Sequence, residues 1–156
     1  MKILQINHTI NKVNRMHVHK ECEVVIYGIG HDVLEIERIS DVIHRGLGKK
    51  FSHRVLTEQE LLLAEQRTGR WAEFVAGRFA AKEAVVKALG CGIGNIVGFQ
   101  DIEILPDAKG KPEVALSPEA WSRLNLPEGH QYNIHLTITH GRDLASAFAV
   151  VEGPGS

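Results

Sequence analysis

Apolar and polar positions along this chain form patterns that predict both strands and helices. The apolar run over residues 24–30 is typical of a strand, and the next apolar positions recur at the spacing of a helix up to Ile43. Thr57 and Glu60 form a capping-box pattern ahead of three leucines, which predicts a helix from Thr57 towards Gly69.

The longest predicted helix covers residues 70–89 and ends at Gly90. Glycine readily adopts the left-handed conformation that closes a helix, so Gly90 marks a natural end. One broad apolar stripe follows the predicted helix, formed by Trp71, Val75, Phe79, Val86 and Leu89. We therefore expect this helix to be the central packing element.

The last third of the chain predicts a hairpin, a short helix and two more strands. Ile102 and Ile104 alternate with acidic residues, and the segment 106–112 supplies turn residues before a second short strand. Ser117 and the proline after it form a good helix start. The elements predicted after the hairpin are a helix over 117–124 and strands over 132–139 and 144–151. This order favours a single α+β domain, in which a mainly antiparallel sheet packs with the central helix, over a doubly wound sheet.

Composition narrows the classes of function. The 156 residues are enough for one domain with its own core, and 18 Lys and Arg against 19 Asp and Glu leave a net charge of −1. This balance gives no general electrostatic case for binding nucleic acid or a membrane surface. Two cysteines cannot build a disulfide framework, and no apolar run of about 18 residues offers a membrane span. We expect a cytoplasmic protein with neither nucleic acid nor membrane as a partner.

The chain divides into an N-terminal extension, a domain and a flexible tail, predicted over residues 1–24, 25–152 and 153–156. The extension lacks the long apolar stretch and the cleavage site of a secretory signal. His17, His19 and Cys22 offer three metal ligands, whereas a structural zinc site requires four. We therefore interpret the extension as a surface tail.

Acidic and basic side chains gather on the predicted central helix around Glu83. Arg78 lies five positions before Glu83 and Lys87 four positions after it, so all three could serve one cleft. Asp32 follows the first predicted strand, and with Glu83 it offers the pair of carboxylates that Mg²⁺ commonly uses together with water and phosphate. Arg78, Lys82 and Lys87 are suited to neutralising phosphate charge.

These residues also have simpler interpretations. A glutamate four positions before a lysine is often a solvated surface pair, and an aspartate after a strand often caps a helix or closes a turn. The alanines around Glu83 weaken the first alternative, because small side chains would let a ligand or another backbone come close. Spacing alone leaves both alternatives open.

Two further features could contribute to a phosphate site. Gly90, Gly92 and Gly94 could cradle a phosphate through backbone amides, but they lack the dinucleotide-binding spacing and follow a helix instead of opening one. They are equally well explained as a helix stop and a flexible loop. His140 ends a predicted strand, where it could be a general base, a phosphate contact or a hydrogen-bonded turn residue.

Five segments of the chain, in order and at natural spacing, resemble the holo-acyl-carrier-protein synthase family of phosphopantetheinyl transferases. They are residues 26–32 with GIGHD, 51–60, 77–88 with GRFAAKEA, 99–104 and 137–140. The resemblance covers about residues 25–151 and implies a phosphopantetheinyl transferase-like fold. It implies transfer of 4'-phosphopantetheine from coenzyme A to a serine of apo acyl carrier protein, which gives holo acyl carrier protein and adenosine 3',5'-bisphosphate.

The same resemblance implies magnesium as cofactor, a place in fatty-acid biosynthesis, and a homotrimer with its active sites at subunit interfaces. Asp32 and Glu83 would bind the metal, and Glu83 or a metal-bound water would take the serine proton. Lys87 would act as a catalytic residue at the pyrophosphate and leaving group, with His140 at the edge of the site. Coenzyme A contacts would come from Arg78, Lys82, Lys87, Gly90, Gly92 and Gly94.

An acidic carrier protein would dock on a basic surface of the early helices. The carrier-contact residues implied by the resemblance are Arg38, Arg45, Phe51 and Arg54, with Lys49 and Lys50 beside them. His31 departs from the family pattern, which usually has an aliphatic or small residue before the metal aspartate. Two other functions stay open: a magnesium-dependent hydrolase of nucleotide pyrophosphates, and a trimeric carrier-binding protein without catalysis.

Overall fold

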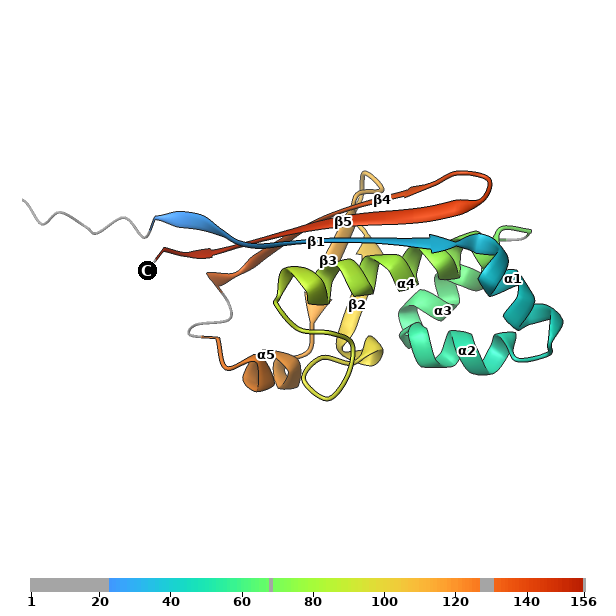
Figure 1. Ribbon diagram of the computed structural model, residues 1–156, viewed down its shortest axis with the longest axis horizontal. Helices are drawn as coiled ribbons and strands as arrows, with labels where there is room; N and C mark the ends of the chain where they lie inside the picture. Colours follow the sequence, from blue (N-terminus) through green and yellow to red (C-terminus); the bar gives the residue numbers. More distant parts are fainter. Residues whose placement is uncertain (1–22, 68, 127–130, 156) are drawn as a thin grey trace, which may run out of the picture.

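The computed structural model describes residues 23–67, 69–126 and 131–155. They form the α+β arrangement that the sequence predicts (Figure 1). The helices are α1 (Ile36–His44), α2 (Gly48–Val55), α3 (Glu58–Glu65), α4 (Trp71–Ala88) and α5 (Pro118–Leu124), with a 3-10 turn η2 at Phe99–Asp101. The strands are β1 (Val24–Glu35), β2 (Ile102–Pro106), β3 (Pro112–Leu116), β4 (Asn133–His140) and β5 (Leu144–Pro154). No helix within these ranges is both long and apolar enough to cross a membrane.

The larger sheet has the antiparallel order β1-β5-β4, and β2 and β3 form a separate hairpin. Figure 1 shows α4 running along one face of the larger sheet, with α1, α2 and α3 grouped at one end and α5 towards the other. Because side chains alternate along a strand, Gly30, Asp32 and Leu34 face α4, whereas Ile29 and Val33 are exposed on the opposite face.

The core surrounds α4, which is buried on nearly all sides. Its alanines and valines supply most of the contact, including the fully buried Val75, Ala80, Ala84 and Val85. The five residues of the predicted apolar stripe all lie in the core or pack against it, so the central packing role is confirmed. The other faces of α4 are buried as well, because small residues there let the sheet and the helices approach α4 closely.

Two glycines of β1 allow the closest approach. A Cβ atom on Gly28 would lie 2.0 Å from the Ala88 carbonyl oxygen, and one on Gly30 would lie 1.8 Å from that of Ala84. Only glycine fits at these positions, since real Cβ contacts under 3.0 Å essentially do not occur. The strand therefore rests directly on the helix backbone, and Asp32, two residues beyond Gly30, is brought to the C-terminal turns of α4.

Several local predictions are confirmed. Thr57 and Glu60 form a complete capping box at the start of α3, and Ser117 accepts a hydrogen bond at the start of α5. Gly90 follows α4 with a φ of +77°, the left-handed conformation expected of a helix stop. The hairpin pairs Ile102 with Leu116.

Other boundaries differ from the prediction. β1 continues to Glu35, so Asp32 lies within a strand opposite Ala147 and neither caps a helix nor closes a turn. The helix predicted to run towards Gly69 ends at Glu65. The sequence-based prediction lacks α2, because Gly46 and Gly48 together indicate a break in regular structure. In the structure only Gly46 has a positive φ, and Gly48 is the first residue of α2.

The predicted flexible tail is also corrected in part. Gly153 and Pro154 belong to β5, where they pair with Val25 and Val24. The Gly155 amide donates to the Glu23 carbonyl oxygen at 2.6 Å. His17, His19 and Cys22, in the extension that we interpret as a surface tail, lie outside the described residues.

Gly30→Ala should destabilise the protein by about 3 kcal/mol, because the new methyl group would force β1 away from α4. Urea unfolding measures this change in the free energy of unfolding. Gly92→Ala is the matched control, since a Cβ there meets nothing within 4 Å. Equal unfolding midpoints for the two variants would contradict the close contact.

Candidate active site

Asp32, Glu83 and Lys87 form a cluster where β1 crosses the C-terminal turns of α4. The Lys87 ammonium donates to Asp32 Oδ1 at 2.8 Å and to the His31 carbonyl oxygen at 3.1 Å. Glu83 lies one helical turn before Lys87 on the same face of α4. The surface-pair alternative is insufficient, because Lys87 binds a strand residue instead of pairing only along its own helix.

The charges of Asp32 and Lys87 both act on the Glu83 carboxyl group. Partial burial raises the pKa of Glu83, the nearby charge of Asp32 raises it further, and Lys87 lowers it. The hydrogen bond to Asp32 in turn raises the pKa of Lys87. A bound cation would reduce the repulsion between the two carboxylates, which Lys87 alone only partly offsets.

This donor set fits magnesium. Mg²⁺ takes hard oxygen ligands and is commonly held by one or two carboxylates, with water and substrate phosphate as the remaining ligands. Asp32 and Glu83 could supply such a pair of carboxylates, with phosphate and water completing the coordination. Across residues 23–67, 69–126 and 131–155, no group of three or more His, Cys, Asp and Glu side chains could hold a metal.

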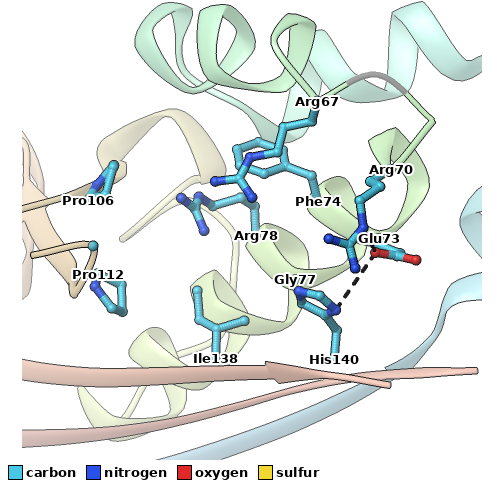
Figure 2. Close-up of a pocket in the computed structure, with 11 residues that line it drawn as sticks. Arg67, Arg70, Glu73, Phe74, Gly77, Arg78, Pro106, Pro112, Ile138 and His140 are labelled. Atoms are coloured by element: carbon cyan, nitrogen blue, oxygen red, sulfur yellow. Dashed lines mark hydrogen bonds and ion pairs between the residues drawn. The ribbon is translucent and has the colours of Figure 1, made fainter. Parts of the chain in front are cut away.

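A cationic cavity lies at the N-terminal end of α4 (Figure 2). Its volume is about 170 Å³, and its wall includes Arg67, Arg70, Arg78 and His140, with prolines of the β2–β3 hairpin opposite. Figure 2 shows His140 reaching from β4 towards Glu73, whose carboxylate is 3.8 Å from His140 Nδ1. A small cavity with three guanidinium groups is suited to an anion such as phosphate.

Arg78 is the most buried of these arginines. Its guanidinium lies 4.6 Å from the centre of the Phe74 ring, and its Nε lies 3.6 Å from Glu60 Oε1 without a hydrogen-bond partner. Burial lowers the pKa of Arg78, Glu60 raises it, and Arg67 lowers it. Because Nε is buried beside Glu60, an anion in the cavity would bind this guanidinium through its Nη groups.

The Arg78 cavity and the Asp32–Glu83 pair lie on different sides of α4. Five residues separate Arg78 from Glu83, which places their side chains about 140° apart around the helix. Within one chain the structure therefore brings Glu83 and Lys87 together but not Arg78, and a cleft that all three serve stays a prediction. His140 likewise lies at the arginine cavity.

Lys82 is not a phosphate contact in this structure, contrary to the sequence-based prediction. Its side chain is completely buried, and the ammonium donates to Glu60 Oε2 at 2.6 Å and to the carbonyl oxygens of Val55 and Phe99 at 2.7 and 2.9 Å. Burial lowers the pKa of Lys82, and Glu60 raises it. All three ammonium protons have partners, so none remains for a substrate.

The glycine cradle is also corrected. The Gly90 amide donates to the Lys87 carbonyl oxygen at 3.1 Å, and the Gly94 amide donates to that of Val97 at 2.9 Å. Two of the three proposed donors are thus used within the loop, as expected for a helix stop. Gly92 is exposed in the same loop. Burial raises the pKa of the Cys91 thiol, which does not favour a nucleophile.

Of the predicted carrier-contact residues, Arg38 lies on α1 and Arg45 at its end, whereas Phe51 and Arg54 lie on α2. Arg38, Arg45 and Arg54 are exposed, whereas Phe51 is half-buried. The Phe51 ring stacks on Phe79 with ring centres 6.1 Å apart, and Phe79 lies one turn before Glu83 on α4. A ligand that bridges these helices would therefore lie next to the carboxylate pair.

Sequence reasoning missed Arg67, Arg70 and Phe79. The two arginines flank a glycine between helices, where no periodic pattern gives their direction. Phe79 lies four positions before Glu83, and this helical spacing could have shown that the two side chains lie on the same face of α4.

Comparison with known proteins identifies the family. Residues 28–149 match the model of the 4'-phosphopantetheinyl transferase superfamily. The chain belongs to this superfamily. It is 45% identical to the holo-[acyl-carrier-protein] synthase of Geobacillus kaustophilus over 132 residues, which cover 84% of this chain and 92% of the relative. The corresponding enzyme of Bacillus cytotoxicus is 46% identical over 131 residues, or 83% and 98% of the two chains.

Solved structures of the same family share the fold. A holo-(acyl-carrier-protein) synthase from Bacillus anthracis, in complex with CoA (3',5'-ADP), has a TM-score of 0.68 at 42% identity and covers 82% of this chain and 97% of its own. The enzyme from Neisseria meningitidis has a TM-score of 0.72 at 38% identity, with 81% and 98% covered. The predicted family and fold are thus confirmed.

Proposed function

We propose that this protein is a holo-[acyl-carrier-protein] synthase, which transfers 4'-phosphopantetheine from coenzyme A to a serine of apo acyl carrier protein. The observation that carries the proposal is the cluster of Asp32, Glu83 and Lys87, which joins a strand and a helix from distant parts of the chain. The named relatives and the coenzyme A complexes of similar structures support the same donor and acceptor.

Glu83 would accept the proton of the carrier serine, because its raised pKa makes it a better base than an ordinary carboxylate. The serine oxygen would then form a bond to the phosphorus that bears pantetheine, and the bond from this phosphorus to adenosine bisphosphate would break. Lys87 would stabilise the charge on the leaving phosphate. Magnesium, held by Asp32 and Glu83, would supply charge neutralisation at the pyrophosphate.

The arginine cavity is our proposed site for the phosphates of the coenzyme A nucleotide. Arg78 would contact the phosphates through the Nη groups of its guanidinium, and Arg67 and Arg70 would complete the charge, with His140 as a contact at the edge. This proposal keeps Arg78 and His140 in the site but moves them from the carboxylate pair to the nucleotide end. Lys82 and the glycine loop have no part in it.

We further propose a homotrimer. Large apolar side chains stand exposed on the outer face of the β1-β5-β4 sheet, among them Ile29, Val33, Leu144 and Phe148. A second copy covering this face would bury them. It would also explain why the arginine cavity and the carboxylate pair lie apart in one chain, since the cavity of one copy could face the carboxylate pair of another across the interface. Cytoplasmic location and a role in fatty-acid biosynthesis stay predictions.

The transfer assay tests the proposed function. With coenzyme A, Mg²⁺ and apo acyl carrier protein, mass spectrometry should show the carrier gaining one phosphopantetheine group. A parallel reaction without carrier protein should leave coenzyme A intact, because no acceptor is present. Rapid release of phosphopantetheine without carrier would favour the pyrophosphate hydrolase, and carrier binding without transfer would favour the non-catalytic trimer.

Two inactive variants should restore each other if the site is shared between copies. Asp32→Asn removes a metal ligand and Arg78→Gln removes a nucleotide contact, and each alone should lose most transfer activity. Mixed trimers from coexpression of the two should regain about a quarter of the wild-type rate, because that share of sites combines two intact halves. A rate no higher than the sum of the separate variants would contradict a shared site.

A further inference from the structure

Lys82 connects α4 to the corner between α2 and α3. Its ammonium donates to Val55 at the end of α2, to Phe99 in η2, and to Glu60 in the first turn of α3. These partners are 17 to 27 residues away in sequence. We name Lys82 with these three acceptors the Lys82 anchor.

The charges of the anchor match the two helix ends that it joins. The C-terminal end of a helix carries partial negative charge and favours a cation, which Lys82 supplies to α2. The N-terminal end favours an anion, and the Glu60 carboxylate accepts from the Thr57 amide at 2.8 Å there. Glu60 also accepts from the Ile104 amide at 3.1 Å, so the corner is tied to β2 as well.

Gln100 holds the same end of α2 from the other side. Its amide group donates to the carbonyl oxygens of Leu56 and His53 at 2.8 and 2.9 Å, and approaches that of Arg54 at 3.3 Å. The carbonyl groups that end a helix have no partners within it, so these contacts replace water at α2. Side chains from α4 and η2 thus determine where α2 ends.

The fixed helix faces the reaction centre. Lys82 immediately precedes Glu83 on α4, and Phe51 of α2 stacks on Phe79, one turn before Glu83. The exposed side of α2 carries Lys49, Lys50 and Arg54, a surface suited to an acidic protein. A carrier protein docked on α2 would therefore present its serine at a distance from Glu83 that depends on the anchor.

We propose that Lys82 is a positioning residue for carrier-protein recognition, acting with Gln100 by fixing α2 relative to Glu83. This inference rests on the proposed function, since it concerns the acceptor of the same reaction. Lys82 is completely buried, so its effect on the carrier protein cannot come from direct contact. The nucleotide cavity does not include Gln100, so coenzyme A recognition should be independent of it. Lys82 shares Glu60 with Arg78 of that cavity, so loss of Lys82 would also disturb Arg78.

Steady-state kinetics of Lys82→Met and Gln100→Leu provide the test. In both variants the KM for apo acyl carrier protein should rise about tenfold, and in Gln100→Leu the KM for coenzyme A should stay within about twofold of wild type. Amide hydrogen exchange should become faster in α2 and stay unchanged in α5. Gln100 is exposed, so Gln100→Leu keeps the proposal testable if Lys82→Met does not fold.

Ser117→Ala is the matched control. It removes the hydroxyl that caps α5 near η2 but leaves the end of α2 bonded, so neither KM should change. Equal increases in both KM values of Gln100→Leu, or no increase for the carrier protein in either variant, would overturn the proposal. A wild-type protein without transfer would instead overturn the proposed function, and hydrogen exchange in α2 would still show whether the anchor fixes this helix.

Discussion

The contact between β1 and α4 is the constraint on which the candidate active site depends. Gly28 and Gly30 remove the side chains that would separate the strand from the helix, and alanines on α4 present bare backbone to them. The strand then carries Asp32 to Lys87, which donates to it at 2.8 Å. The carboxylate pair therefore results from packing at positions that take no part in the chemistry themselves.

Burial separates the basic residues of α4 by role. Lys82 and Glu60 are completely buried and satisfy each other together with backbone groups, so their charges stabilise one arrangement of helices. Lys87 is exposed and Arg78 lines a cavity, so a ligand could reach both side chains. Basic residues within two or three turns of one helix thus differ in whether a ligand could contact them.

The sequence allowed prediction of local elements, of the family and of candidate site residues. The capping box at Thr57, the stop at Gly90 and the hairpin depend on neighbouring residues, so they could be predicted from them. Asp32 and Glu83 were identified because short segments around them resemble a known family. The role of Lys82 could not be predicted, since its acceptors come from three distant segments that only tertiary packing brings together. The direction of Arg78 depends likewise on packing, here against Phe74 and Glu60.

The most direct test of the account is the rate of transfer by Glu83→Gln, which keeps the shape of the side chain but removes its charge and its basicity. With coenzyme A, Mg²⁺ and apo acyl carrier protein, mass spectrometry should show a rate at least about 100-fold below wild type, while the unfolding midpoint stays close to that of wild type. Glu119→Gln, an exposed change on α5, is the control and should keep full activity. A Glu83→Gln protein that transfers phosphopantetheine within about twofold of the wild-type rate would contradict the assignment of the reaction centre.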